Sequence, residues 1–245
     1  MISILTSSPT KEINETCPLP ALDERNGFID LLKHVWKSPS RCLMIAAFPD
    51  AYDRNDEMTW FYSEAVKNAG LPWSCFDLWD DRNPGFSKEE LQRYDVISLA
   101  GGHGPTEGRW CESIGLKGKL EGYGGSVLGT SAGSMNMAVE VYGWPEEEGE
   151  SFDPNHRLFF AGLGLAKTVV LPHYQKIRDN WLDGRRLMED ITCSHSFGKK
   201  FYAIPDGSFV WVQGGKETLY GEARLVSEGE ITSFSWENQI VELSP

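Results

Sequence analysis

Ser131 lies among small residues in the segment VLGTSAGSMNMA, residues 127–138, between an apolar run and a helix-like continuation. Gly129 and Gly133 complete the pattern G-x-S-x-G, which is typical of a sharp strand-to-helix turn. Small neighbours allow such a turn to raise a serine hydroxyl above a sheet, where it can act as a nucleophile. The alternative is a serine that only caps the N-terminus of the following helix.

A serine nucleophile needs a base, and histidine is the usual one because its pKa of about 6.5 lets it accept a proton near neutral pH. His173 ends the strand-like run AKTVVLPHY, residues 166–174. Ligands of α/β proteins gather at such strand ends, although this position equally fits a half-buried histidine held by a backbone carbonyl. The other histidines have ordinary positions on a helix, in loops or after a helix: His34, His103, His156 and His195.

An acidic residue must orient the base. Asp206 lies in the segment YAIPDGSFVWV, residues 202–212, between two strand-like runs. Pro-Asp-Gly is also ordinary turn chemistry, which alone explains this aspartate. Acidic residues between Glu140 and Asp153 are the competing candidates.

Two backbone N–H groups would stabilise the oxyanion that forms when a serine attacks a carbonyl. The N–H of Ala132 directly follows the serine, and the second donor is expected from the glycine loop AGGHGPTEG, residues 100–108. His103 in this loop either contacts a substrate or caps the turn.

Strand-like and helix-like segments alternate through the first half of the chain, and these elements must position the candidate groups. Apolar runs predict buried strands, and apolar residues at helical spacing predict helices, one of them capped by Ser87. This alternation predicts an α/β fold with a mostly parallel central sheet and helices on both faces. The strands are expected at residues 2–5, 41–48, 73–79, 95–102 and 125–131, and the helices at 22–36, 55–69 and 86–94.

The second half of the chain changes character after an acidic loop at residues 146–156. A helix is expected at residues 176–192, after the strand at 166–174. From residue 201 onward, β-rich runs predict C-terminal antiparallel strands or hairpins at the edge of the sheet. No linker marks a boundary, so residues 1–245 are interpreted as a single domain.

The composition excludes some classes of partner. The chain has 36 acidic and 23 basic residues and a net charge of −13, so no nucleic-acid partner is expected. No segment reaches transmembrane length and the N-terminus lacks a signal-peptide pattern, so no membrane partner is expected. Five widely spaced cysteines without a C-x-x-C motif fit the reduced thiols of a cytoplasmic protein better than disulfides or a zinc site.

Four ordered stretches resemble peptidase family S51, the group of peptidase E (alpha-aspartyl dipeptidase) and cyanophycinase. These stretches are VISLAGGHGPT, VLGTSAGSMNMA, AGLGLAKTVVLPHYQ and AIPDGSFVWV, and the resemblance covers residues 41–215. It implies the class I glutamine-amidotransferase-like, flavodoxin-like sheet. It also implies that Ser131 is the nucleophile and His173 the base, with Asp206 at a position where the family more commonly has Glu.

The same resemblance assigns the oxyanion donors to Ala132 and to Gly102 or His103. In the family, the residues of this loop, with Thr106 among them here, help to hold the substrate. Many members have G-G-G-N-T or G-G-D-T, whereas this chain has G-G-H-G-P-T. Family aspartyl dipeptidases also bind the acidic side chain of the substrate with basic residues after the catalytic histidine, a region that here contains Arg178, Arg185 and Arg186.

The sequence therefore predicts a serine peptidase that hydrolyses short peptides, including dipeptides with an N-terminal Asp, through an acyl-enzyme. No metal or organic cofactor is expected, and the oligomeric state is open, a homodimer included. The lack of a cysteine at the turn argues against a glutamine amidotransferase, and the order Ser, His, acid argues against an α/β-hydrolase. The competing interpretation, which the altered glycine loop favours, is a non-catalytic protein that binds a small molecule or peptide.

Overall fold

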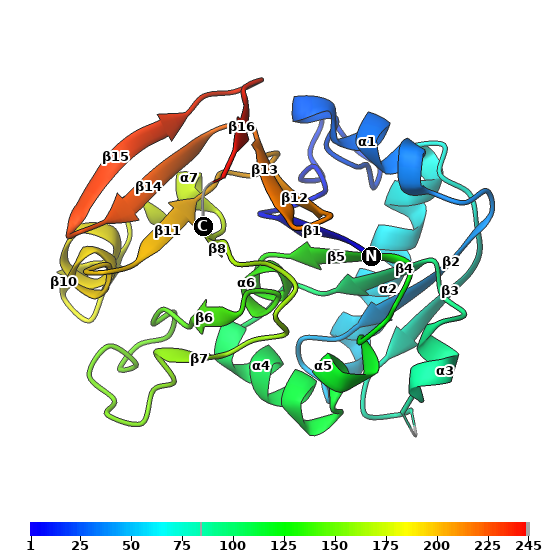
Figure 1. The fold of residues 1–245 in the computed structure, drawn as a ribbon, viewed down its shortest axis with the longest axis horizontal. Coiled ribbons are helices and arrows are strands. Elements are labelled where there is room, and N and C mark those ends of the chain that lie inside the picture. Colours follow the sequence, from blue (N-terminus) through cyan, green and yellow to red (C-terminus); the bar gives the residue numbers. More distant parts are fainter. Residues whose placement is uncertain (84, 244–245) are drawn as a thin grey trace.

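A computed structural model describes residues 1–83 and 85–243 and contains an eight-stranded sheet (Figure 1). The strand order is β16-β13-β12-β1-β5-β4-β2-β3. Every pairing from β1 to β3 is parallel, and every pairing from β1 to β16 is antiparallel. The bounds are β1 (Ile2–Thr6), β2 (Ser40–Ile45), β3 (Trp73–Trp79), β4 (Val96–Leu99), β5 (Ser126–Thr130), β12 (Phe209–Gln213), β13 (Lys216–Tyr220) and β16 (Ile240–Glu242).

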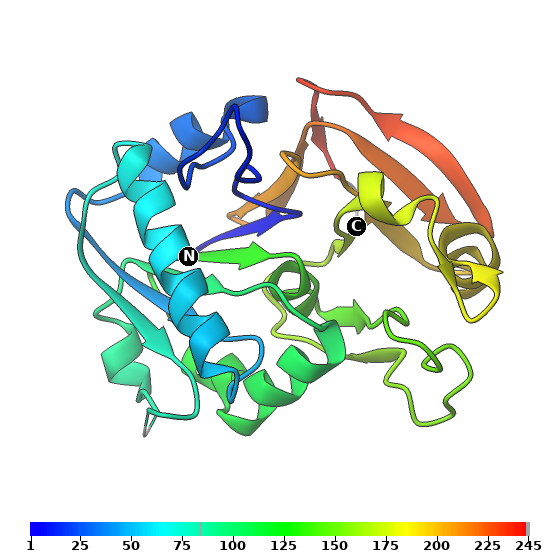
Figure 2. The ribbon, with the colours of Figure 1, turned by 180° about the vertical axis from the view of Figure 1, so that it is seen from behind.

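Successive side chains of a strand point to opposite sides of the sheet, so both faces of this sheet carry apolar side chains. Helices cover both faces. One face carries Ile4 and Leu128 and packs against helices near the start of the chain (Figure 2). The other face carries Leu5 and Val127 and packs against three later helices. These helices are α1 (Phe28–Val35) and α2 (Tyr52–Asn68) on the first face, and α3 (Lys88–Leu91), α4 (Gly104–Ser113) and α5 (Leu116–Lys119) on the second. The prediction of an α/β fold with a large, mostly parallel sheet flanked by helices is confirmed.

A four-stranded sheet with the order β15-β14-β11-β8 lies beside the carboxyl ends of the parallel strands (Figure 1). Here β8 pairs with β11 in parallel, and the other pairings are antiparallel. The β-rich runs near the end of the chain therefore divide between two sheets, and the turn from β11 to β12 leads from one sheet to the other. The bounds are β8 (Val169–Leu171), β11 (Lys200–Ala203), β14 (Ala223–Ser227) and β15 (Glu230–Ser235).

Short elements follow β5 along the chain and lead toward the second sheet (Figure 1). The helix α6 (Ala132–Asn136) follows β5 after one residue, and β6 (Glu140–Tyr142) pairs with β7 (Phe159–Ala161) on either side of the acidic loop. Within the part of the chain that the structure describes, no helix is long and apolar enough to cross a membrane.

The prediction of a helix at residues 176–192 is wrong. The helix α7 (Tyr174–Ile177) ends after one turn, and the hairpin of β9 (Trp181–Leu182) and β10 (Arg185–Arg186) follows. A π-helical segment, Leu187–Thr192, completes this region. The hairpin turn Asp183-Gly184 has φ values of 52° and 76°, and Asp-Gly is a favoured pair for two left-handed residues in a hairpin. This turn chemistry overrides the helical spacing of the apolar residues.

Candidate active site

Ser131 occupies a strained turn between β5 and α6. Its backbone has φ 51° and ψ −115°, a conformation that L-residues rarely adopt and that functional sites often retain. Its N–H donates to the carbonyl oxygens of Thr6 and Ser7, each at 3.1 Å. The Ser131 side chain makes no capping hydrogen bond to α6, so the interpretation as a simple helix cap does not describe it.

The positions on either side of the Ser131 turn require glycine, because atoms of Leu99 and Ser134 leave no room for a side chain there. A Cβ atom at Gly133 would lie 2.5 Å from the Leu99 carbonyl oxygen, and one at Gly129 would lie 2.7 Å from the backbone of Ser134. The Ser134 hydroxyl in turn ties α6 to β1, because it donates to the Thr6 carbonyl at 2.7 Å. These contacts hold α6 tightly against β4 and β1, as the G-x-S-x-G pattern indicates.

His173 follows β8 and precedes α7, at the side of the molecule that the carboxyl ends of β4 and β5 face (Figure 1). Its backbone is also left-handed, with φ 59° and ψ 34°. Its Nδ1 lies 2.7 Å from Oδ1 of Asp206. The His173 side chain is 29% exposed and that of Asp206 15%, so the imidazole is the part of this pair that a substrate can reach.

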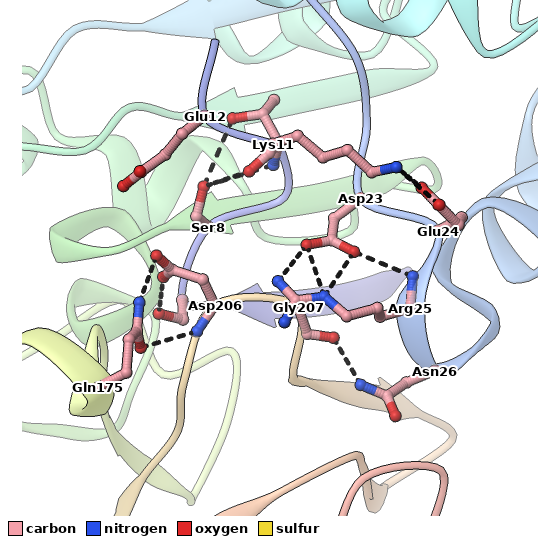
Figure 3. A network of polar contacts seen from close by, with 12 residues as sticks. Ser8, Lys11, Glu12, Asp23, Glu24, Arg25, Asn26, Gln175, Asp206 and Gly207 are labelled. Carbon is pink, nitrogen blue, oxygen red and sulfur yellow. Dashed lines mark hydrogen bonds and ion pairs between the residues drawn. The ribbon is translucent and has the colours of Figure 1, made fainter. Parts of the chain in front are cut away.

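Asp206 lies in the turn that leads from β11 to β12, and several donors surround it. Burial raises the pKa of this carboxyl, but hydrogen bonds from His173 and Ser7 and the nearby Lys176 outweigh burial and lower the pKa to about 2. Gln175 Nε2 donates to Oδ2 at 2.6 Å, and Gln175 Oε1 accepts the Asp206 N–H at 3.1 Å (Figure 3). Asp206 is therefore ionised at neutral pH, and an ionised carboxylate can only accept a hydrogen bond from His173 Nδ1–H.

The competing acids lie elsewhere. Glu150 Oε1 is 3.1 Å from Nε2 of His103 and 3.5 Å from Nδ1 of His156. Glu140 forms an ion pair with Lys199. Of the sequence-derived acid candidates, Asp206 is the one that the structure brings to His173.

The glycine loop lies against Ser131, as predicted from its position after β4. A Cβ atom at Gly101 would lie 3.4 Å from Cβ of Ser131. Gly102 packs on Ala47 and Phe48, since a Cβ atom there would lie 2.6 Å from Cβ of Ala47. Ala132 is the first residue of α6, where an N–H has no partner within the helix.

The side chains of His103 and Thr106 bond to each other. His103 Nδ1 lies 2.8 Å from Oγ1 of Thr106, and the His103 residue is 8% exposed. The His103 side chain is therefore buried at the start of α4, whereas Thr106 is only half-buried.

Sequence reasoning missed three residues at this site. Ser7 directly follows β1, and its hydroxyl donates to Asp206 Oδ1 at 2.6 Å. Gln175 bonds the other oxygen of the same carboxylate. Arg54 Nη2 reaches the Gly101 carbonyl at 3.5 Å, and its guanidinium lies over the Phe48 ring at 4.7 Å. Of these, Gln175 carried a signal, because it stands two residues after His173 in the family-like segment.

The arginines after His173 are engaged elsewhere. Arg178 pairs with Asp179, and Arg186 pairs with Asp190. Arg185 Nη2 bonds the Ser151 carbonyl at 3.2 Å. A cavity of about 740 Å³ adjoins Asp206 instead, and its lining includes Lys11, Arg25 and Lys176. Figure 3 shows Lys11 and Arg25 near Asp206, paired with Glu24 and Asp23. Within residues 1–83 and 85–243, no cluster of three or more His, Cys, Asp or Glu side chains could hold a metal ion.

Comparison with known proteins adds to this geometry. Among solved structures, a peptidase from an acI-B1 Actinobacterium aligns with 99% of this chain and 96% of its own, with a TM-score of 0.65 and 14% identity. A putative peptidase E protein from Listeria monocytogenes EGD-e aligns with 88% of this chain and 96% of its own, with a TM-score of 0.54 and 15% identity. No curated protein matches the chain.

At these identities the solved structures show a shared fold. The comparison with family models also shows the family of the chain. The model of peptidase family S51 matches residues 76–220, which is more than half of the chain. The matched range includes Ser131, His173 and Asp206. The chain belongs to peptidase family S51.

Proposed function

We propose that this protein is a serine peptidase that hydrolyses short peptides through an acyl-enzyme. The observation that carries the proposal is the His173–Asp206 pair, joined at 2.7 Å, beside a turn that forces Ser131 into a strained backbone. The family supports the same chemistry.

In the proposed reaction, Asp206 holds the proton on Nδ1 of His173, so that Nε2 accepts the Ser131 proton as Oγ attacks the peptide carbonyl. The N–H of Ala132 and one N–H from Gly102 or His103 stabilise the oxyanion. The protonated His173 then gives its proton to the leaving amine. Water attacks the acyl-enzyme with His173 again as base, which releases the acid and restores Ser131.

The preferred substrate in this proposal is a dipeptide with an N-terminal Asp. Arg54 supports it, because this exposed guanidinium bonds the carbonyl of Gly101, the residue that lies against Ser131. A cation at that place would attract a substrate carboxylate, even though the chain has a net charge of −13.

Ser131→Ala tests the reaction. Wild type and variant are assayed against dipeptides and aminoacyl p-nitroanilides, with Asp-Xaa peptides in the panel. The wild type is expected to hydrolyse Asp-Xaa, and the variant to lose activity by about 10⁶-fold, since a serine nucleophile acts with its base as a unit. Equal turnover in both proteins, with the fold of the variant intact by circular dichroism, would overturn the mechanism.

One observation favours a second candidate, a protein that binds peptides without cleaving them. The ring of His173 contacts Asp206 and the Ser7 hydroxyl, and within the described residues no hydrogen bond joins it to Ser131. Hydrogen bonds between nucleophile and base often tighten only when substrate is bound, so this geometry is compatible with catalysis. Calorimetric binding of Asp-Xaa peptides that remain uncleaved would favour the binding protein.

A further inference from the structure

Ser7 contacts all three parts of the candidate site, although it lies far from them in the sequence. Its carbonyl oxygen accepts the Ser131 N–H at 3.1 Å. Its hydroxyl accepts the His173 N–H at 2.7 Å and donates to Asp206 Oδ1 at 2.6 Å. The residue is fully buried, at 0% exposure. Within the described residues, the hydrogen bonds of the Ser7 hydroxyl go to His173 and Asp206, the proposed base and acid.

The proton count around Ser7 permits one arrangement. An ionised carboxylate only accepts hydrogen bonds, so both Ser7 Oγ and His173 Nδ1 must donate to the shared Oδ1 of Asp206. Ser7 Oγ and His173 Nδ1 are 3.5 Å apart, a separation that suits two donors on one acceptor. The lone pair of the Ser7 hydroxyl remains for the His173 N–H. This arrangement keeps the proton on Nδ1 and leaves Nε2 as the basic nitrogen.

We propose that Ser7 is a positioning residue of this peptidase, which holds the backbone of His173 in its left-handed conformation and fixes the carboxylate oxygen that orients the imidazole. The inference rests on the proposed function and adds a fourth side chain to it. Ser7 acts through His173 and Asp206 and does not itself meet the substrate.

The place of Ser7 in the fold suits this role. It directly follows β1, which lies between β5 and β12 inside the large sheet. The preceding residue, Thr6, bonds to Ser134 of α6 through its N–H at 2.8 Å. Residues 6 and 7 thus connect the turn of the nucleophile to the base and the acid, which come from separate parts of the chain.

Other charged and titratable groups lie near the Asp206 carboxylate, and they also influence the pH dependence of the activity. Lys176 of α7 lies 3.8 Å from Asp206 Oδ2 and also pairs with Glu12. Arg25 lies against Gly207, the residue after Asp206. The buried phenol of Tyr62 on α2 also feels the charge of Asp206. None of these groups is altered when Ser7 is substituted, so a changed pH profile reports the loss of the Ser7 hydroxyl.

The test compares three variants of Ser7 with a neighbouring control. Ser7→Ala removes the hydroxyl, Ser7→Cys keeps the volume with a weak donor, and Ser7→Thr keeps the hydroxyl. Ser8→Ala is the matched control, because the Ser8 hydroxyl bonds the Thr10 carbonyl at 3.0 Å, outside the site. Circular dichroism and thermal unfolding check that each variant folds. If Ser7→Ala does not fold, Ser7→Cys is compared with wild type in its place.

We expect kcat to fall about 10-fold to 100-fold in the Ala and Cys variants with KM little changed, because supporting hydrogen bonds of a site have effects of this size. The acidic limb of the kcat profile should move to higher pH, because Asp206 without the Ser7 donor presents more charge to His173. Ser7→Thr should recover most of kcat, and Ser8→Ala should match wild type. Unchanged kcat and pH profile in both folded Ala and Cys variants would overturn the proposal.

A second measurement separates this inference from the proposed function. Proton NMR of the free protein observes the hydrogen-bonded Nδ1–H of His173, assigned with His173→Gln, and needs no turnover. If the wild type cleaves no peptide, loss of this signal in Ser7→Ala but not in Ser8→Ala still supports the positioning role. If the signal is the same in all three proteins, the positioning role fails even where the wild type is an active peptidase.

Discussion

His173 and Ser131 both have positive φ values, 59° and 51°, although neither is a glycine. Non-glycine residues adopt such conformations at a free-energy cost of about 1–3 kcal/mol each, so the surrounding structure must hold them in place. Ser7 contributes to both, because its carbonyl accepts the Ser131 N–H and its hydroxyl accepts the His173 N–H. The strain of the site is thus balanced by backbone hydrogen bonds from the residue that follows β1.

Asp206→Asn tests the acid. An amide at this position can donate a hydrogen bond to Nδ1, which favours the tautomer with the proton on Nε2 and removes the base. We expect kcat to fall by about 10⁴-fold, as in the corresponding substitution of a Ser-His-Asp protease, while the protein stays folded.

Asp153→Asn is the matched control for this loss, because Asp153 caps a turn at Asn155 in the acidic loop. Its kcat should equal that of wild type. A large loss in Asp153→Asn with little loss in Asp206→Asn would move the role of the acid to the loop and contradict the assignment.

The candidate residues that the sequence indicates are those whose neighbours form a pattern. Ser131 stands in G-x-S-x-G, and His173 and Asp206 stand at the ends of apolar runs. Ser7 carries no such signal, because a serine after a short strand occurs in many loops and its partners lie 166 and 199 residues away. Arg54 was missed for the same reason, since only the fold brings α2 to the glycine loop.

The short helix α6 determines the position of Ser131, the proposed nucleophile. A Cβ atom at position 133 would lie 2.5 Å from the Leu99 carbonyl and 2.7 Å from the Leu99 side chain. Both neighbours belong to β4, which is fully buried in the sheet. The helix must therefore move before a larger residue fits, and Ser131 would move with it.

Gly133→Ala tests this packing against Gly118→Ala. We expect the first to lower the free energy of unfolding by about 1–3 kcal/mol, as overpacking does, and to reduce kcat. Gly118 lies within α5, and apart from its chain neighbours and the backbone of its own helix no described atom lies within 4 Å of its Cβ position. Alanine there should therefore be neutral or stabilising by up to about 1 kcal/mol. Denaturant unfolding measures both, and equal stability of the two variants would contradict the tight contact of α6 with β4.

Element boundaries were predictable where capping or turn residues mark them. Ser87 and Glu90 form the capping box of α3, and Gly70 ends α2 with a φ of 76°. The region of α4 and α5 had no clear assignment, because α4 includes two glycines and a proline. The helix expected at 176–192 is absent because Asp183-Gly184 forms the turn of a hairpin.

A buried carboxyl between α4 and α6 affects the stability of the whole molecule. Glu107 is 0% exposed, and Asn136 donates to its Oε2 at 3.2 Å. Burial raises the pKa of Glu107 well above its usual range. The folded protein therefore holds this proton more tightly than the unfolded chain. The contribution of Glu107 to the free energy of unfolding is fully present below the ordinary Glu pKa of about 4.3. It is lost as the pH rises toward the raised pKa of Glu107 in the folded protein.

Glu107→Gln should remove this dependence, because the amide resembles the protonated carboxyl at every pH. We expect the variant to be more stable than wild type at pH 8, with a difference that shrinks as the pH approaches 4. Thermal unfolding across this range measures the effect. Glu121→Gln, on an exposed side chain, is the control and should follow the wild-type curve; a Glu107→Gln curve parallel to wild type would contradict the buried proton.

At the scale of the whole molecule, alternating strands and helices predicted the large sheet, because buried apolar strands between helices have few other arrangements. The division of the last strands between two sheets was not predictable. The runs that form β11 and β12 have the same β-rich character, and only the turn at Asp206 separates them. That turn crosses between the sheets and also carries the acid of the candidate site.

The central position of β1 has a consequence for synthesis on the ribosome. This strand pairs with β5 and with β12, so its second neighbour is made about two hundred residues later. Ser7 and His173 are both synthesised before β11, the strand that pairs with β8, and before Asp206. If the proposed reaction is right, we expect a growing polypeptide to gain peptidase activity only after β11 and β12 have emerged and β12 has paired with β1.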